Sequence, residues 1–156
     1  MSKRTRVTEE DLGWAAILKE VSNAKSARVH VGIMEGEAER DDDSEIDNVA
    51  LGIIHEYGRG NNPERSFMRS TFDEDRRGLI RLKERLWSQV LRGRLTTSQA
   101  LELMGQEHQE AVQAKIVALQ YPPLAPSTLR QRKFGGTNPL VDTSDFYRSI
   151  TYQLVG

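Results

Sequence analysis

Residues 48–72 read NVALGIIHEYGRGNNPERSFMRSTF and residues 121–154 read YPPLAPSTLRQRKFGGTNPLVDTSDFYRSITYQL; the two stretches flank a long helical middle. Both combine glycine and proline turns, helix-capping residues and short apolar anchors. Neither contains a complete set of catalytic groups. This combination favours an assembled structural part over an enzyme that turns over a substrate.

A small sheet is predicted outside these stretches. Residues 27–33, ARVHVGI, alternate apolar and polar side chains, so they form a half-buried strand with Arg28 and His30 on its open face. Residues 149–155 alternate in the same way and predict a second strand. Because two strands alone are marginal, we expect further strands from the edges of the 34–48 segment or from neighbouring subunits.

Helical periodicity predicts the remaining elements. Thr8 is expected to cap a short N-terminal helix, which carries one apolar stripe and ends near residues 22–24. The stripe consists of Trp14, Ile17, Leu18 and Val21. A second short helix follows Asp47 or Asn48 as its cap and stops at Gly58.

Two long helices complete the prediction. The first runs from Ser66 to about Arg92, and the second follows a capping box formed by Thr96 and Gln99 and ends near Gln120. The predicted fold class is therefore α+β: a small antiparallel sheet packed with a short N-terminal helix and two long helices. We expect one domain over residues 1–156.

Composition limits the classes of protein. Of the 156 residues, 37% are apolar and 29% are charged, a balance typical of globular domains with a polar surface. The absence of cysteine excludes disulfides and thiolate metal sites. The N-terminal residues lack the apolar stretch of a secretory signal, and no run approaches the about 18 apolar residues that a membrane span needs. We expect a protein without membrane contact, made and used in the cytoplasm or released by lysis.

Charge is unevenly distributed along the chain. The net charge is −1, yet residues 34–48, MEGEAERDDDSEIDN, carry eight acidic residues against Arg40 alone. Such a stretch predicts a flexible, solvated acidic loop. The overall balance does not match a general nucleic-acid-binding protein.

Two patterns of histidine or acidic residues could indicate metal sites. His55-Glu56 resembles the start of a zinc-protease motif, but the second histidine needed one turn later is replaced by Arg59. A histidine at a helix C-terminus, bonding the terminal carbonyls, is the simpler interpretation. Asp41, Asp42 and Asp43 are consecutive, whereas a calcium loop needs alternating acids and a glycine. No catalytic residue, metal or cofactor is therefore predicted.

A basic ridge on the first long helix is the candidate DNA-facing surface. Arg77, Arg81 and Arg85 follow one another at i+4 steps, a spacing that can track phosphates. Asp73 lies four residues before Arg77, so we expect surface ion pairing to use part of this charge. Gly135-Gly136 lacks the lysine and hydroxyl of a phosphate loop and predicts a turn.

The two stretches together resemble tailed-bacteriophage neck and tail-completion proteins of the Mu-type virion morphogenesis group, including minor tail protein-like members. The first resemblance is a short helix with His-Glu-Tyr-Gly, then Pro-x-Arg-x-Phe and a long helix, carried by Ala50, His55, Glu56, Tyr57, Gly58, Pro63, Arg65, Phe67 and Met68. The second is independent and covers residues 123–129, Lys133, residues 139–143 and residues 149–150. In that group the position of Thr128 begins a short helix, and Asp142 and Thr143 form a turn before the last strand. Ser144 stands where a glycine is usual.

The resemblance assigns structural roles to these residues. It implies that Pro63 and Arg65 fix the start of the first long helix and that Asp142 to Ser144 cap the turn before Phe146. Phe67 and Phe72 are expected to pin that helix to the sheet.

The resemblance implies a structural virion protein in tail completion or head–tail joining, assembled in the host cytoplasm and carried in the virion. The expected state is a homo-oligomeric ring, with a hexamer as one candidate size, contacting adjacent neck, connector or tail proteins. DNA would pass through the ring without specific recognition, and the acidic 34–48 segment would meet a neighbour or line the channel. Two alternatives remain open: a DNA-contacting packaging accessory that uses the basic ridge, and a metal hydrolase at His55-Glu56.

Overall fold

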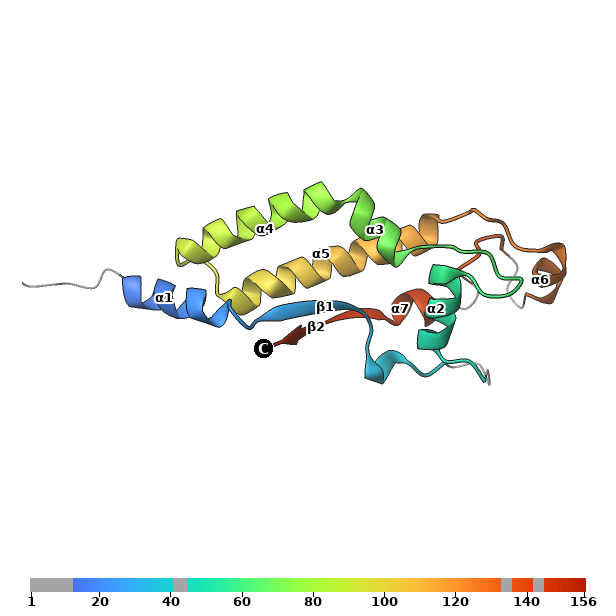
Figure 1. Cartoon of the computed structure of the whole chain (residues 1–156), viewed down its shortest axis with the longest axis horizontal. Helices are drawn as coiled ribbons and strands as arrows, with labels where there is room; N and C mark the ends of the chain where they lie inside the picture. Colours follow the sequence, from blue (N-terminus) through green and yellow to red (C-terminus); the bar gives the residue numbers. More distant parts are fainter. Residues whose placement is uncertain (1–12, 41–44, 133–135, 142–144) are drawn as a thin grey trace, which may run out of the picture.

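The computed structural model describes residues 13–40, 45–132, 136–141 and 145–156. It confirms the α+β class, with helices packed against a two-stranded antiparallel sheet (Figure 1). The elements in chain order are α1 (Trp14–Asn23), β1 (Arg28–Ile33), the 3-10 helix η1 (Glu35–Glu37), α2 (Asn48–Tyr57), α3 (Met68–Glu74), α4 (Arg76–Leu91), α5 (Thr97–Ala118), α6 (Pro126–Gln131), α7 (Asp145–Arg148) and β2 (Ile150–Val155).

The sheet pairs the two predicted strands. β1 and β2 run antiparallel in a register that sets Val31 opposite Tyr152 and Ile33 opposite Ile150. The apolar face rests on α5, while Arg28 and His30 lie exposed on the other face, as their alternation predicts. In the described part of the 34–48 segment the chain forms η1 and no strand, so an additional strand from there is not seen.

The longest helix, α5, organises the molecule. It packs against both strands on one side and pairs with α4 on the other (Figure 1). Its N-terminus carries the predicted capping box, because the Thr96 hydroxyl accepts from the Gln99 amide and the Gln99 side chain accepts from the Thr96 amide. Gly105 permits close contact with the sheet, since a Cβ there would lie 2.6 Å from Tyr152 Cδ2 and 2.7 Å from Val29 Cγ2.

Two hydrophobic clusters hold these layers together. The larger joins α5, the last strand and the two turn-rich stretches through Phe67, Val112, Ile116, Leu140, Phe146 and Ile150. The smaller lies where α4 meets the start of α5 and contains Leu86, Val90 and Ala100. The rings of Phe67 and Phe146 meet edge to face with centroids 5.4 Å apart.

The prediction of one continuous helix from Ser66 to Arg92 is wrong. The chain leaves helical geometry at Asp75, with φ −102° and ψ 14°, so α3 ends there and α4 begins. The Asp75 carbonyl accepts from the Leu79 amide to start α4, and its carboxylate lies where a Cβ on Gly78 would stand. Asp75 makes no side-chain hydrogen bond to the first turn of α4, but Gly78, which has no Cβ, leaves room for its carboxylate at the break.

Phe67 and Phe72 were both expected to pin the first long helix to the sheet, and only Phe67 has such a buried position. Phe67 is buried in the larger cluster, whereas Phe72 is about half exposed and contacts the ring of His108 on α5. Phe72 therefore contacts the central helix and does not reach the sheet.

Several predictions fall outside the described residues. These are the Thr8 cap, the Asp41–Asp43 acids, Gly135, and the turn formed by Asp142, Thr143 and Ser144. Among the helices that the structure describes, none is long and apolar enough to cross a membrane.

Candidate functional site

The end of α2 and the beginning of α3 meet at the carboxylate of Glu56. Oε2 accepts from the amides of Phe67 and Met68, both at 2.9 Å, and Oε1 accepts from the Arg69 amide at 2.9 Å and the Ser66 hydroxyl at 2.8 Å. Burial alone raises the pKa of Glu56, but these hydrogen bonds outweigh it and hold the pKa below its ordinary value. Glu56 thus acts as a buried helix cap supplied from another helix.

Arg69 completes this junction from the outside. Its Nε lies 2.9 Å from Glu56 Oε1, and its Nη2 donates to the Glu56 carbonyl at 2.8 Å and to Glu64 at 2.7 Å. The guanidinium also lies 4.6 Å from the centre of the Tyr57 ring. The Glu56 carboxylate therefore already has an ionic partner, which leaves it poorly placed to act as a general base.

The turn between the two helices depends on Gly58. Its φ of 70° is a left-handed conformation, and an added Cβ would lie 2.9 Å from the Glu64 amide nitrogen. The chain then folds back so that the Arg65 amide donates to the His55 carbonyl at 2.7 Å. This turn brings Arg65 next to the beginning of the second turn-rich stretch, at Pro122 and Pro123.

Arg65 links the two quoted stretches directly. Only 4% of its surface is exposed, its Nε donates to the Pro122 carbonyl at 2.9 Å, and its Nη2 donates to the Pro123 carbonyl at 3.1 Å. Among the described residues no carboxylate pairs with it. Burial lowers the pKa of the Arg65 guanidinium, as expected for a cation away from water.

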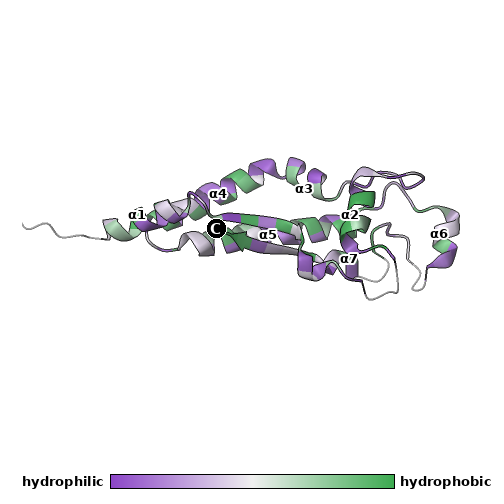
Figure 2. Ribbon diagram, turned by 60° about the horizontal axis from the view of Figure 1, so that its bottom comes forward, coloured by the Kyte–Doolittle hydropathy of each residue, from purple (hydrophilic) through white to green (hydrophobic). Residues whose placement is uncertain are grey.

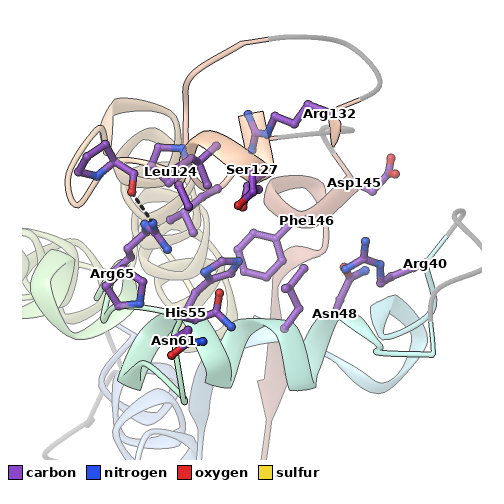
Figure 3. A pocket seen from close by; sticks show the side chains of 18 residues that line it. Arg40, Asn48, His55, Asn61, Arg65, Leu124, Ser127, Arg132, Asp145 and Phe146 are labelled. Atoms are coloured by element: carbon purple, nitrogen blue, oxygen red, sulfur yellow. Dashed lines mark hydrogen bonds between the residues drawn. The ribbon is translucent and has the colours of Figure 1, made fainter. Parts of the chain in front are cut away.

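A cavity of about 800 Å³ opens beside Arg65, between α2, α6 and α7. Figure 3 shows Arg40, Arg65 and Arg132 on different sides of it, with the rings of His55 and Phe146 between them. Asp145 is the one acidic side chain among the described residues that line the cavity. The wall is completed by apolar groups of Leu51, Leu124, Pro139 and Leu140.

His55 lies in the wall of this cavity, with its ring edge to face against Phe146. Burial, followed by the charges of Arg65 and Arg40, lowers its pKa from 6.5 to about 4. Its Nδ1 is buried, and no other described group hydrogen-bonds to it. The simple prediction that this histidine bonds the terminal carbonyls of α2 is therefore wrong, because the ring turns inward.

The remaining motif residues are spread around this junction. Ala50 lies within α2, Pro63 lies in the turn and borders the cavity, and Thr128 lies in α6 and also borders it. Phe67 is the buried N-cap residue of α3. Asp142 and Thr143 lie outside the described residues, so the structure says nothing of their positions.

The basic ridge lies elsewhere, on α4. Arg77, Arg81 and Arg85 are exposed, and no hydrogen bond or ion pair joins them to any residue the structure describes. The ion pair expected between Asp73 and Arg77 does not form. Asp75 and Glu107 border the same shallow hollow as Arg81 and Arg85, which reduces the local positive potential.

No group of three or more histidine, aspartate or glutamate side chains in the described segments could hold a metal ion. No family model, no curated protein and no solved structure matches this chain.

Sequence reasoning identified His55 and Arg65 but missed Arg132 and Asp145 as neighbours of theirs, and it noted Arg40 only as a charge. These side chains come close together only because α2, α6 and α7, which are far apart in the sequence, meet in the fold. A lone arginine in an acidic stretch was the available signal for Arg40.

Proposed function

We propose that this chain is a structural virion protein of a tailed phage and acts in tail completion or head–tail joining as the subunit of a closed ring. Support comes from the resemblance of both turn-rich stretches and from the use of their residues. Glu56, Gly58, Arg65 and Phe67 all serve internal contacts that fix α2, α3 and the Pro122–Pro123 segment relative to one another. Residues that act in this way shape a subunit rather than convert a substrate.

Helix α1 lies at one end of the elongated molecule (Figure 1) and contains both apolar and polar residues (Figure 2). Trp14, Leu18 and Val21 follow one another at helical spacing and remain exposed, Trp14 to 65%. The helix itself is held in place, because the Thr97 amide donates to Glu20 Oε2 at 2.6 Å and the Thr97 hydroxyl donates to the Glu20 carbonyl at 2.9 Å. An ordered helix therefore presents apolar side chains to the outside.

A second apolar stripe lies on α2, away from α1. Val49, Ile53 and Tyr57 follow i+4 spacing and are exposed, Ile53 to 57%. The opposite side of α2 carries the buried residues Asn48, Gly52 and Glu56, so the helix cannot turn this stripe inward. Both stripes thus have the character of surfaces that a partner covers.

The chain segments next to the two stripes also carry opposite charge. Residues 13–28 and 92–96 near α1 contain five basic residues, Lys19, Lys25, Arg28, Arg92 and Arg94, against Glu20. Residues 34–40 and 45–47, which lead into α2, contain five acidic residues, Glu35, Glu37, Glu39, Glu45 and Asp47, against Arg40. These two groups of described segments therefore carry +4 and −4, which favours contact between the α1 stripe of one copy and the α2 stripe of another.

The presence of two unlike surfaces on one subunit is the observation that carries the proposal. A ring is a heterologous interface that closes, so each subunit needs two different, complementary surfaces. The α1 stripe with its basic surroundings and the α2 stripe with its acidic surroundings meet that requirement. An isologous dimer would need only one surface that complements itself.

Sedimentation of the purified chain at several protein and salt concentrations tests the proposal. We expect a discrete oligomer whose mass is a multiple of the 17.7 kDa subunit, weakened by salt because the end charges are exposed. Trp14→Ser with Leu18→Ser should reduce it to monomer, and so should Val49→Ser with Ile53→Ser. Val117→Ser, at another exposed apolar position on α5, is the matched control and should leave the oligomer intact.

A DNA-contacting packaging accessory is the second candidate, favoured by the exposed ridge of Arg77, Arg81 and Arg85, which no residue in the described part of the chain pairs with. It predicts duplex DNA binding that falls steeply with salt. Changing the three arginines to glutamine should then abolish binding without affecting oligomer mass. Equal DNA binding by the triple variant and the parent chain would remove this candidate.

A further inference from the structure

We propose that the outer edge of β1 binds an extended segment of a partner protein as a third strand of the sheet, and that this segment alternates apolar with acidic residues. The segment runs antiparallel to β1, with its apolar side chains toward α5 and an acidic side chain beside Arg28. This site is separate from the α1 and α2 stripes, and it does not depend on ring formation.

The register of the sheet decides which backbone groups of β1 face away from β2. The Ile150 carbonyl accepts from Gln113 Nε2 of α5 at 3.0 Å, so it points away from β1. In an antiparallel pair, two residues that stand opposite each other face inward together or outward together, and the two kinds of pair alternate. Ile33, which stands opposite Ile150, therefore faces outward, and so do Val31 and Val29.

The chain just before β1 agrees with this assignment. The Ala27 amide, two residues before Val29, donates to the Asn23 carbonyl at 3.3 Å and so faces away from β2. The outward amides and carbonyls of Val29 and Val31 have no hydrogen-bond partner among the residues that the structure describes. Unpaired backbone groups of this kind are the ones that an added strand binds.

The edge of β1 lacks two features that commonly keep a strand from pairing. β1 contains no proline, and its register with β2 runs from Arg28 to Ile33 without a bulge. Val29 and Val31 are only partly buried, although both lie on the face that packs against α5 and the larger cluster. Apolar side chains of an added strand would cover more of this face, which adds hydrophobic stabilisation to the backbone hydrogen bonds.

The open face of the sheet selects the polar residues of the added strand. Arg28 is exposed, and no ion pair joins it to any residue in the described segments. Because Val29 and Val31 make the outward hydrogen bonds, Arg28 falls in a non-hydrogen-bonded pair with the added strand, where facing Cα atoms stand only about 4.5 Å apart. An acidic side chain opposite Arg28 is therefore favoured, whereas a basic one is repelled.

A different protein fits this edge better than a second copy of the chain does. β1 reads RVHVGI and β2 reads ITYQLV, so neither strand offers an acidic residue to Arg28. The β2 edge is less suited to an acidic segment, because Gln113 already occupies the Ile150 carbonyl and the polar side chains of β2 carry no charge. β1 is therefore the docking edge.

The test follows backbone amide exchange by NMR in the full-length chain, with two blocked peptides: acetyl-Thr-Val-Glu-Val-Glu-Val-Thr-amide and acetyl-Thr-Val-Lys-Val-Lys-Val-Thr-amide. The glutamate peptide should slow exchange of the Val29 and Val31 amides at least about tenfold, because these amides gain hydrogen-bond partners. The His30 amide, which already faces β2, should change little. The lysine peptide should bind at least about threefold more weakly.

Backbone pairing has a matched control within the peptide. In the antiparallel arrangement the peptide valines stand opposite Val29 and Val31 and donate their amides to β1, whereas the glutamate amides face the other way. N-methylation of the three valines should therefore abolish the slowing of exchange. N-methylation of the two glutamates should preserve it.

A charge reversal on β1 tests the selection of acidic residues. Arg28→Glu should reverse the preference, so that the lysine peptide binds more tightly than the glutamate peptide. Arg77→Glu, the same change of charge at an exposed position on α4, is the matched control and should leave the preference unchanged. Both replaced side chains are exposed, so we expect both variants to fold.

Four results would each overturn the proposal. The first is slowed exchange at Tyr152 and Leu154 of β2 in place of Val29 and Val31, and the second is equal binding of the peptide with N-methylated valines. The third is an unchanged preference in Arg28→Glu. The fourth is slow exchange at Val29 and Val31 that appears as the protein concentration rises without peptide, which would identify a second copy as the occupant.

Discussion

Glu56 and His55 are adjacent in the sequence, yet the fold places them in opposite electrostatic surroundings. Hydrogen bonds to the Glu56 carboxylate favour its charged form, whereas burial and two arginines favour the neutral form of His55. The resemblance to a zinc-protease motif therefore reflects two separate structural positions. The ionisation of Glu56 and of His55 gives two predictions of how the free energy of unfolding changes with pH, each over a different pH range.

Glu56→Gln should lower the free energy of unfolding by about 2–4 kcal/mol at pH 7, because a buried, charged hydrogen-bond acceptor is lost. The wild-type pKa is depressed in the folded state, so this contribution is present above the unfolded value of 4.5 and is lost as pH falls below it. Urea titrations at pH 7 and pH 3 should show the difference between the two proteins shrinking in acid. Glu64→Gln, which removes an exposed partner of the same Arg69, should cost no more than about 1 kcal/mol. A difference between Glu56→Gln and wild type that stays constant with pH would contradict the cap.

The His55 prediction concerns the range from pH 6.5 to about 4. In that range the unfolded chain takes up a proton that the folded chain does not, so stability is full above 6.5 and falls as pH decreases. The shift corresponds to about 3 kcal/mol in all. His55→Phe, which keeps a ring against Phe146, should flatten this slope, while His30→Gln should not. Direct titration of His55 by NMR near its ordinary value would refute the buried site.

At the residue scale, local chemistry was predictable and long-range partners were not. The Asp47 cap, the Thr96–Gln99 capping box and the Gly58 stop depend on neighbours within a few positions. The bond from Arg65 to Pro122 spans a sequence separation of 57 residues and no periodicity encodes it. The cavity was missed for the same reason.

At the scale of elements, apolar periodicity identified both strands and α5 but did not reveal the break at Asp75. The helical pattern continues through α3 and α4, and the only local signals of the break are Asp75 and Gly78. Periodicity also could not tell which stripes are covered. Leu86 and Val90 on α4 are buried, whereas the α1 stripe has the same spacing and remains exposed.

The contact between α5 and the sheet gives a prediction at this scale. Gly105→Ala should destabilise the fold by about 1–3 kcal/mol, because its methyl group would lie less than 3 Å from Tyr152 and Val29 and force α5 away from the strands. Gly36→Ala, where no atom lies within 4 Å, is the matched control and should stay within about 0.5 kcal/mol. Equal thermal unfolding of both variants would show that α5 and the sheet are not in close contact.

At the scale of the whole molecule, the fold is long and thin, with a two-stranded sheet and two exposed helix stripes (Figure 1). Such a shape buries little apolar surface within one chain. The α+β class followed from the sequence. That the two stripes lie on helices far apart in the molecule, each beside a segment of opposite charge, could be seen only in the structure.

Mixing two assembly-defective variants tests the central claim most directly. Trp14→Ser with Leu18→Ser leaves only the α2 surface, and Val49→Ser with Ile53→Ser leaves only the α1 surface. Native mass spectrometry should find each variant monomeric alone and a dimer in the equimolar mixture, with nothing larger, because only one heterologous contact can form. Two monomers that stay apart in the mixture, or a full oligomer formed by either variant alone, would contradict the account.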